Sequence, residues 1–373
     1  MKDINTFISE SLQQRIKNHS LRTLKPENSL IDFCSNDYLG FSRSEELKML
    51  FDDELKNYPE YRLGSGGSRL LAGNHSFTES LENQIAIFHD SESALIYNSG
   101  FDANIGLFAS LPQRGDTIIS DEYIHASIID GIRLSHASRY IFRHNDLSSL
   151  EQKLKLAKGK IFIVVESAYS MDGDEAPLKE ITKLAKQYNA ALIVDEAHAV
   201  GIFGESGRGM VHELGLCEEV FARIITFGKA LGTHGAAILG SSQLRSYLIN
   251  FSRAFIYTTA APFLNHLAVK SAYLYFKSRD HQTDIHQRIK LFKQSIKSGT
   301  KLLDSRSAIQ IIVIPGNDKA REAARLIQQG GFDVRAILSP SVAAGSERLR
   351  ICLHNHNLTT EIKNLCELLN RIL

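Results

Sequence analysis

The segment Ile224–Gly232 reads IITFGKALG, and it joins an apolar run to one lysine, Lys229, set among small residues. The apolar run is typical of a strand buried in a sheet. A lysine just past such a strand is well placed in a cleft, where burial and nearby cations lower its pKa and make it a former of Schiff bases. A lone lysine of this kind is more often an ordinary residue at a strand end, so the rest of the chain decides between the two interpretations.

Apolar runs alternate with helical patterns around this segment. Such runs occupy residues 93–97, 117–120, 161–165, 191–195 and 222–227. Runs of this kind between helices predict an α/β fold with a mostly parallel sheet that is buried on both faces. Beyond residue 262 the pattern predicts a long helical stretch to about residue 304, strands near 308–315, 332–337 and 348–353, and helices near 318–330 and at the end of the chain.

We therefore expect three parts in the chain. They are an N-terminal helix and arm over residues 1–45, a large α/β domain over 46–262, and a smaller α+β domain with a linking helix over 263–373. The N-terminal helix is expected because the apolar residues between Phe7 and Ile16 are spaced for one helix face. A length of 373 residues agrees with more than one structural unit.

The composition is that of an ordinary globular protein, with 43% hydrophobic and 23% charged residues. A net charge of +1 gives no reason to expect nucleic acid or a membrane surface as a partner. No apolar run approaches the roughly 18–20 residues of a membrane span, and the N-terminus lacks the pattern of a signal peptide. The four cysteines form no CxxC pair, which predicts reduced thiols in a cytoplasmic enzyme.

Polar residues collect where the predicted strands end. In a parallel sheet the carboxyl ends of the strands share one edge, and ligands bind there. A single polar residue at a strand end carries little information, but several such ends together predict a site. The residues concerned are Ser99 with Gly100, Glu166, Asp195 with His198, and Thr226 with Lys229.

The turn at Ser99-Gly100 lies between a predicted strand and a predicted helix. The start of a helix offers free N–H groups and the positive end of the helix dipole, and both attract anions. The turn therefore predicts a phosphate site, with a plain tight turn as an equal alternative.

Asp195 and Lys229 together indicate a cofactor. A carboxylate at the end of a buried strand is costly unless it meets a cation. If Lys229 holds pyridoxal phosphate, the pyridinium nitrogen is that cation, and the ring can accept electrons from a substrate carbanion. His198 is placed to reach the phenolic oxygen of the ring. The residues that would hold the phosphate are Ser99, Gly100, Phe101 and Thr226.

A series of motifs runs through the chain in a characteristic order. They are Asn36–Gly40, Gly64–Arg69, Ser99–Phe101, Asp121 with His125–Ser127, Ser170–Asp174, Asp195–His198, Thr226–Lys229 and Arg348–Arg350. In this order they resemble the α-oxoamine synthases, which are pyridoxal-phosphate enzymes of fold type I. The resemblance extends from about residue 10 to the end of the chain.

This resemblance implies roles for the matched residues. Lys229 forms the Schiff base, Asp195 pairs with the pyridine nitrogen, and His198 bonds the phenolic oxygen. His125 stacks on the ring and touches the substrate. Arg350 binds the carboxylate of the amino acid, which a planar guanidinium suits well. Lys229, His125 and Asp195 are the residues we expect to act in catalysis.

Further implied contacts lie around these residues. Gly100, Phe101 and Thr226 lie at the phosphate of the cofactor, and Ser170 lies at the cofactor itself. Thr258 or Thr259 reaches the phosphate in the neighbouring subunit of a homodimer whose sites lie at the interface. Arg22 and Ser341 contact the acyl substrate or the product.

The resemblance also implies the reaction, a decarboxylative condensation of an amino acid with an acyl thioester. Lys229 is first the anchor and then the base that removes the Cα proton. The motifs are most similar to members that join L-alanine to pimeloyl-CoA or pimeloyl-acyl carrier protein in biotin biosynthesis. Members that use glycine or serine, such as glycine C-acetyltransferase and serine palmitoyltransferase, stay open as alternatives, because one or two side chains set the amino-acid pocket.

Two other classes are disfavoured. No predicted strand is followed by GxGxxG, which argues against a nicotinamide-dependent oxidoreductase. A catalytically inactive binding partner is disfavoured because Lys229, Asp195, His198 and Arg350 are all present.

Overall fold

The computed structural model of the chain describes residues 3–18, 21–24, 26 and 28–373. These residues belong to two units, Met1–Leu30 and Ile31–Leu373. In the first unit, α1 (Ile4–Lys17) begins after Asp3, whose side chain accepts a hydrogen bond from the backbone N–H of Asn5. The helix expected near the N-terminus is thus present. The domain boundaries expected at residues 45 and 262 stay a prediction.

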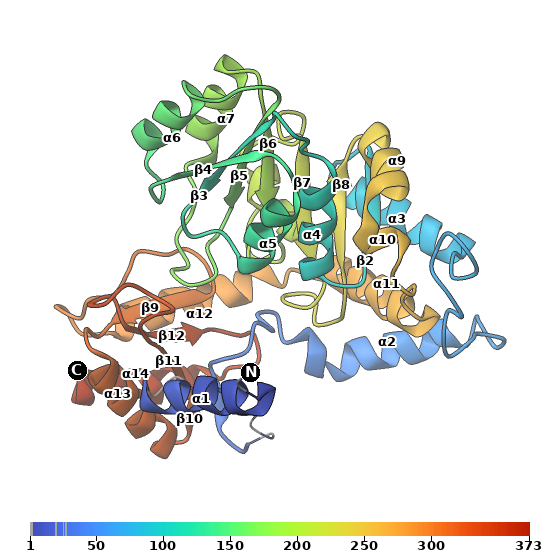
Figure 1. Ribbon diagram of the computed structural model, residues 1–373. Helices are drawn as coiled ribbons and strands as arrows, with labels where there is room; N and C mark the ends of the chain where they lie inside the picture. The colour runs from blue at the N-terminus through green and yellow to red at the C-terminus, as the bar shows by residue number, and fades with distance from the viewer. Residues whose placement is uncertain (1–2, 19–20, 25, 27) are drawn as a thin grey trace. The chain divides into compact units, whose positions relative to one another are not determined.

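Within residues 28–373, a seven-stranded sheet forms the centre of the second unit (Figure 1). Its strand order is β2-β8-β7-β6-β5-β3-β4. The strands are β2 (Ser93–Tyr97), β3 (Thr117–Asp121), β4 (Ser138–Phe142), β5 (Ile161–Glu166), β6 (Ala190–Asp195), β7 (Ala222–Thr226) and β8 (Ala236–Gly240). β4, β3, β5, β6 and β7 pair in parallel, whereas β8 is antiparallel to both β7 and β2. The expected mostly parallel sheet is confirmed.

Two of these strands, β4 and β8, were not expected from the sequence. β8 reads AAILG, and alanine and glycine have low strand propensity by themselves. It forms because β7 and β2 pair with it on both sides. β4 reads SRYIF and lies at the edge of the sheet, where partial exposure removes the continuous apolar run that marks a buried strand.

The apolar runs of the central strands are continuous because both faces of the sheet are covered. Successive residues on a strand point to opposite faces. Val164 therefore packs in one core with Phe108 and Ile128, and Val165 packs in the other with Ile181. The helices of this part are α2 (Glu45–Leu55), α3 (Ser76–Phe88), α4 (Gly100–Ser110), α5 (Ala126–Leu134), α6 (Leu147–Leu154), α7 (Leu178–Gln187), α8 (Met210–Glu213), α9 (Ser242–Phe251) and α10 (Arg253–Ile256), with 3-10 turns at Phe41–Arg43 and Glu205–Gly207.

The prediction of one helical stretch from 263 to about 304 is wrong, because the stretch is divided. It consists of α11 (Phe263–Ser278) and α12 (Gln282–Ser295), and residues 296–304 are not helical. The break has a local cause. Arg279 is extended, and the Asp280 carboxylate accepts hydrogen bonds from the N–H groups of Gln282 and Thr283, which starts a new helix.

The C-terminal part contains a three-stranded antiparallel sheet in the order β11-β12-β9, as counted over residues 28–373. Its elements are β9 (Ile309–Val313), α13 (Asn317–Gln329), β11 (Arg335–Ile337), β12 (Arg348–Cys352) and α14 (Thr359–Ile372). The strand expected at 332–337 is interrupted at Val334. Its first half, β10 (Phe332–Asp333), pairs in parallel with β1 (Ile31–Asp32).

The segment after β1 is held against the C-terminal sheet. The N–H of Cys352, at the end of β12, donates to the carbonyl of Phe33 at 2.9 Å, and the N–H of Asn355 donates to the carbonyl of Tyr38 at 2.9 Å. These bonds bring the motif Asn36–Gly40 beside Arg350 on β12. None of the helices formed by the described residues combines the length and the apolar character that crossing a bilayer requires.

Candidate active site

A cavity of about 200 Å³ lies where β5, β6 and β7 end. Glu166, Asp195 and Thr226 are the last residues of these three strands. The lining residues are Gly100, Phe101, Asn104, His125, Glu166, Asp195, Ala197, His198, Ile224, Thr226 and Lys229. Most of the residues grouped from the sequence as strand-end residues therefore share one cavity.

Lys229 is half-buried in the loop between β7 and β8. Burial lowers the pKa of its ammonium group, Arg350 adds to this effect, and the carboxyl groups of Asp195 and Glu166 oppose it. The lowered pKa favours the neutral, nucleophilic amine. Gly232 shapes this loop, because its φ is +59° and a Cβ there would lie 2.3 Å from the backbone nitrogen of Ser42.

Asp195 is buried and is held by neutral donors. Its Oδ2 accepts a hydrogen bond from Asn104 Nδ2 at 3.0 Å, and its Oδ1 accepts one from the N–H of Ala197 at 2.9 Å. Across residues 28–373 the salt bridges include none at Asp195. A buried carboxylate without a paired cation is costly, so the site fits a cationic ligand atom beside it.

His125 immediately precedes α5, and its ring lies at the cavity. Its Nδ1 accepts a hydrogen bond from the N–H of Ser127 at 3.2 Å and lies 2.7 Å from the Ser127 hydroxyl. Burial lowers the pKa of His125, with Lys229 adding to the effect and Asp195 opposing it. The ring is therefore neutral and fixed by Ser127.

His198 is buried, and its Nδ1 lies 2.7 Å from the hydroxyl of Tyr38. Burial lowers the pKa of His198 well below its ordinary value, and the charges of Lys229 and Arg350 add to this. The ring is therefore neutral as well, and Nε2 is the nitrogen left for the cavity.

The start of α4 forms one wall of the cavity. Ser99 caps this helix, because its hydroxyl accepts a hydrogen bond from the N–H of Asp102 at 3.0 Å and donates to the Asp102 carboxylate at 2.8 Å. Gly100 faces Thr226, and a Cβ at Gly100 would lie 3.8 Å from the Thr226 hydroxyl. The helix start thus opens onto the cavity, as an anion site requires.

Arg350 presents its guanidinium group to neutral acceptors. Nε donates to the carbonyl of Ser170 at 2.8 Å, Nη2 donates to Asn36 Oδ1 at 3.0 Å, and Nη1 lies 2.9 Å from the sulfur of Cys352. None of the salt bridges within residues 28–373 involves Arg350. Its positive charge is therefore available to a carboxylate ligand.

Other expected site residues lie outside the cavity wall. Thr258 accepts a hydrogen bond from Asn98 Nδ2 through its hydroxyl at 3.1 Å, and Thr259 accepts one through its carbonyl at 2.8 Å. Ser341 is exposed in the loop before β12. Arg22 is exposed and belongs to the unit Met1–Leu30. The substrate and partner contacts expected for these residues stay predictions.

Several residues of the site had no role assigned from the sequence. Asn104 donates to both Asp195 and Ser127. The sequence signal that could have indicated it is its position one helical turn after Gly100. Glu166 pairs in register with Asp195 across β5 and β6 and is buried, and its Oε1 has no hydrogen-bond partner among the described residues. Burial, with Asp195 adding to it, raises the pKa of Glu166 to about 8.

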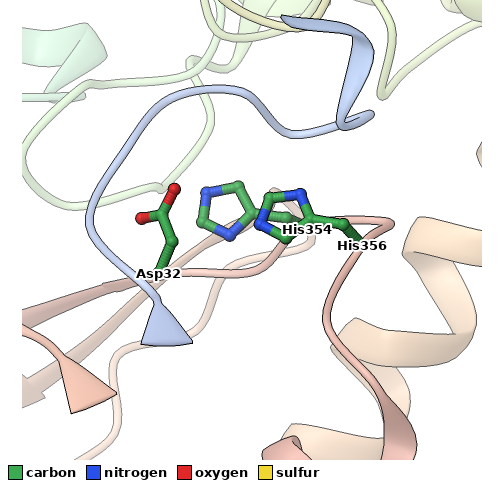
Figure 2. A group of neighbouring side chains, drawn as sticks. All are labelled: Asp32, His354 and His356. Carbon is green, nitrogen blue, oxygen red and sulfur yellow. The ribbon is translucent and has the colours of Figure 1, made fainter. Parts of the chain in front are cut away.

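Asp32, His354 and His356 form a second cluster (Figure 2), and none of them lines this cavity. Its groups are close enough for a shared metal ion, but the ligand atoms of Asp32 and His354 already have hydrogen-bond partners. Asp32 accepts from the N–H groups of Cys34 and Ser35, each at 2.9 Å, and from the guanidinium of Arg43 at 2.7 Å. A guanidinium on the carboxylate opposes a further cation, so the cluster fits a structural network better than a metal centre.

His354 has hydrogen-bond partners at both ring nitrogens, whereas Nδ1 and Nε2 of His356 have none among the described residues. His354 Nδ1 lies 3.1 Å from Asn357 Oδ1, and Nε2 lies 3.0 Å from the carbonyl of Ser35. The His354 and His356 rings stack, with centroids 4.6 Å apart (Figure 2). Burial lowers the pKa of His356 to about 3, and the charges of His354 and Arg43 contribute.

Comparison with known proteins shows the family. The family model for class I and II aminotransferases matches residues 28–369. A protein of Emericella nidulans named 8-amino-7-oxononanoate synthase is 40% identical over 392 residues, which cover 98% of this chain and 95% of that protein. The chain belongs to the α-oxoamine synthases.

Solved structures agree with this assignment. This α-oxoamine synthase is similar to 8-amino-7-oxononanoate synthase from Francisella tularensis, with a TM-score of 0.76 and 28% identity over 92% of this chain and 98% of that one. It is also similar to serine palmitoyltransferase of Sphingomonas wittichii, with a TM-score of 0.88 and 25% identity over 100% of this chain and 97% of that one. The expected family and the expected fold type I are confirmed.

The cofactor of this α-oxoamine synthase is pyridoxal 5′-phosphate, as expected from the sequence. The cavity fits it in three respects: Lys229 offers an amine of lowered pKa, Asp195 is a buried carboxylate without a salt bridge among the described residues, and α4 begins at the wall.

Proposed function

We propose that this enzyme condenses L-alanine with a pimeloyl thioester and releases CO2, a free thiol and 8-amino-7-oxononanoate. The observation that carries the proposal is the cavity in which Lys229, Asp195 and His198 meet, in a chain 40% identical to a protein named for this product. In the balanced reaction a bond forms between the alanine Cα and the thioester carbonyl carbon. The carbon–sulfur bond breaks, and the carboxylate of alanine leaves as CO2.

Different residues of the cavity would hold different parts of the cofactor. Lys229 would bind it covalently through its amine, and Asp195 would neutralise the protonated ring nitrogen. His198 would serve the phenolic oxygen, and the start of α4 with Thr226 would hold the phosphate. When bound, pyridoxal phosphate supplies an electron sink for negative charge at the substrate Cα.

Arg350 binds the carboxylate of alanine. Its hydrogen bonds to Ser170 and Asn36 go to neutral oxygens and set the plane of the guanidinium group. A planar cation held in this way orients a carboxylate and thereby fixes the position of the neighbouring Cα.

Lys229 is the base that removes the proton from the Cα of alanine. A base works best when its pKa lies near the working pH, and burial moves Lys229 in that direction. The nearby carboxylate of Asp195 then stabilises the protonated amine, which returns the proton at the end of the reaction. His125, neutral and fixed by Ser127, would pack on the cofactor ring and hold the geometry for the incoming carbonyl.

A homodimer completes the proposal. Phe101 lines the cavity and is nevertheless 46% exposed, and Tyr257, next to Thr258, is 72% exposed. A second copy of the chain would cover such apolar surface near the cavity and bring Thr258 or Thr259 to the phosphate of its partner. Arg22 and Ser341 would contact the acyl chain. The four cysteines are free thiols, which supports a cytoplasmic setting.

A second candidate is the related condensation that uses serine or glycine. The specific observation in its favour is the TM-score of 0.88 to serine palmitoyltransferase. The two functions share the cofactor site and differ in the amino acid and the acyl chain.

The test is a matrix of amino acids (alanine, glycine, serine, threonine) against acyl-CoAs of increasing chain length, with thiol release as the measurement. We expect the highest kcat/KM for alanine with pimeloyl-CoA. A preference for glycine with acetyl-CoA, or for serine with palmitoyl-CoA, would overturn the assignment and leave the cofactor in place.

A further inference from the structure

Tyr38 lies behind His198 and has no role in the function described so far. Its side chain is 0% exposed, and its hydroxyl lies 2.7 Å from His198 Nδ1 and 3.2 Å from Asn36 Oδ1. The bond from Asn355 to the Tyr38 carbonyl holds its backbone against the C-terminal part. A buried hydroxyl placed on one nitrogen of a histidine affects which nitrogen carries the proton.

Tyr38 and His198 are both neutral, so the hydrogen bond between them can run in either of two directions. Burial raises the pKa of Tyr38 and lowers the pKa of His198. In one arrangement the Tyr38 hydroxyl donates to Nδ1, and the ring proton is on Nε2. In the other, Nδ1 carries the proton and donates to Tyr38, whose hydroxyl then donates to Asn36.

The distances favour the first arrangement. A hydroxyl that donates to another oxygen lies about 2.5–3.0 Å from it, and N–H donors most often lie about 2.9–3.0 Å from oxygen. The 3.2 Å between Tyr38 and Asn36 is long for a hydroxyl donor, and the 2.7 Å to His198 is short for an N–H donor. Asn36 Oδ1 already accepts from Arg350, which can only donate.

The same chain contains a second buried pair that serves as a reference. His89 Nδ1 lies 3.0 Å from the carbonyl of Arg208, and a carbonyl can only accept, so Nδ1 carries the proton. Its Nε2 must then accept from the hydroxyl of Tyr273, and that distance is 2.8 Å. A tyrosine that donates to a buried histidine in this fold thus shows nearly the distance found between Tyr38 and His198.

We propose that Tyr38 is a positioning residue that places the proton of His198 on Nε2, so that His198 offers a hydrogen-bond donor to the cavity. The phenolic oxygen of the cofactor accepts this bond, and this consequence rests on the proposed function. Tyr38 contacts His198 and Asn36 accepts from Arg350, so the motif Asn36–Gly40 supports both the cofactor and the substrate side of the cavity.

The direct test is the nitrogen-15 NMR spectrum of the cofactor-free protein with labelled histidine, in which His198→Gln identifies the His198 signals. We expect an unprotonated Nδ1 and a protonated Nε2 in the unchanged protein. In Tyr38→Phe, the Nδ1 signal moves toward that of a nitrogen without a hydrogen bond. A proton on Nδ1 in the unchanged protein would overturn the proposal. The result is independent of the substrate, so it stands apart from any failure of the proposed function.

The consequence for the cofactor has its own measurement, the affinity of the cofactor-free protein for pyridoxal phosphate. Loss of one positioned hydrogen bond predicts a dissociation constant about fivefold higher in Tyr38→Phe. Tyr273→Phe is the matched control, because it removes a buried hydroxyl from His89, and we expect a change of less than about twofold there. Equal affinities of the two variants would contradict the role in cofactor binding.

Discussion

Asp195 and Glu196 are neighbours in the chain, but their side chains lie in different surroundings. Glu196 is fully buried and satisfied: Oε2 accepts from Arg223 Nε at 2.9 Å, and Oε1 accepts from the N–H of Val211 at 2.9 Å. Arg223 in turn donates to the carbonyls of His89 and Arg208. Asp195 faces the cavity and has only neutral donors. A complete network stabilises the fold, whereas an incomplete one is ready for a ligand.

The largest effect expected is on activity at the cavity. Lys229→Ala removes both the covalent anchor and the base, so turnover falls by at least about 10⁴-fold. The stability of the cofactor-free protein changes little or rises, because a half-buried amine of lowered pKa is lost. Thiol release and thermal unfolding measure the two effects. A large loss of stability would place Lys229 with the structural network instead.

In Glu196→Ala, unlike in Lys229→Ala, the large effect expected is on stability. It leaves Arg223 buried and unpaired, so the free energy of unfolding falls by about 3–5 kcal/mol. Urea unfolding of the cofactor-free protein, followed by circular dichroism, measures the change. Asp195→Ala is the matched control at the next residue, and we expect it to cost less than half as much. Equal losses for the two variants would remove the distinction between the two carboxylates.

Asp195→Asn keeps the shape of the side chain and removes its charge. The ring nitrogen of the cofactor would then have no carboxylate partner, and we expect kcat to fall about 150- to 5,000-fold, the range that loss of a buried ion-pair partner predicts. Steady-state kinetics at saturating cofactor separate this effect from weaker cofactor binding. An activity within tenfold of the unchanged enzyme would contradict the pairing.

The raised pKa of Glu166 predicts an effect of pH on stability. Its pKa rises from the ordinary 4.5 to about 8, so the folded protein holds this proton where the unfolded chain has released it. This contribution to stability is complete below about pH 4.5 and is lost as the pH rises through about 8. In Glu166→Gln the corresponding slope of stability against pH disappears in the cofactor-free protein. A slope equal to that of the unchanged protein would assign the effect to other groups.

The sequence predicted well what depends on local pattern. Apolar runs identified β5, β6 and β7 because both faces of these strands are covered, and the polar residues at their ends indicated the cavity. β8 was not predicted, because its alanines and glycine form a strand only by pairing with β2 and β7. The break between α11 and α12 was not predicted, because the apolar periodicity continues on both sides of Asp280.

The identity of the chemical groups and their order in the chain were thus readable from the sequence alone. Lys229, Asp195 and His198 carry their chemistry in their residue types and their motifs. The tertiary structure decided which of these groups form hydrogen bonds with one another. Tyr38 meets His198 across 160 positions, and Arg350 meets Asn36 across 314, because parallel pairing of β1 with β10 and the bond from Cys352 to Phe33 bring distant segments together. Hydrogen bonds and burial act through space, and neither is encoded in the spacing of residues along the chain.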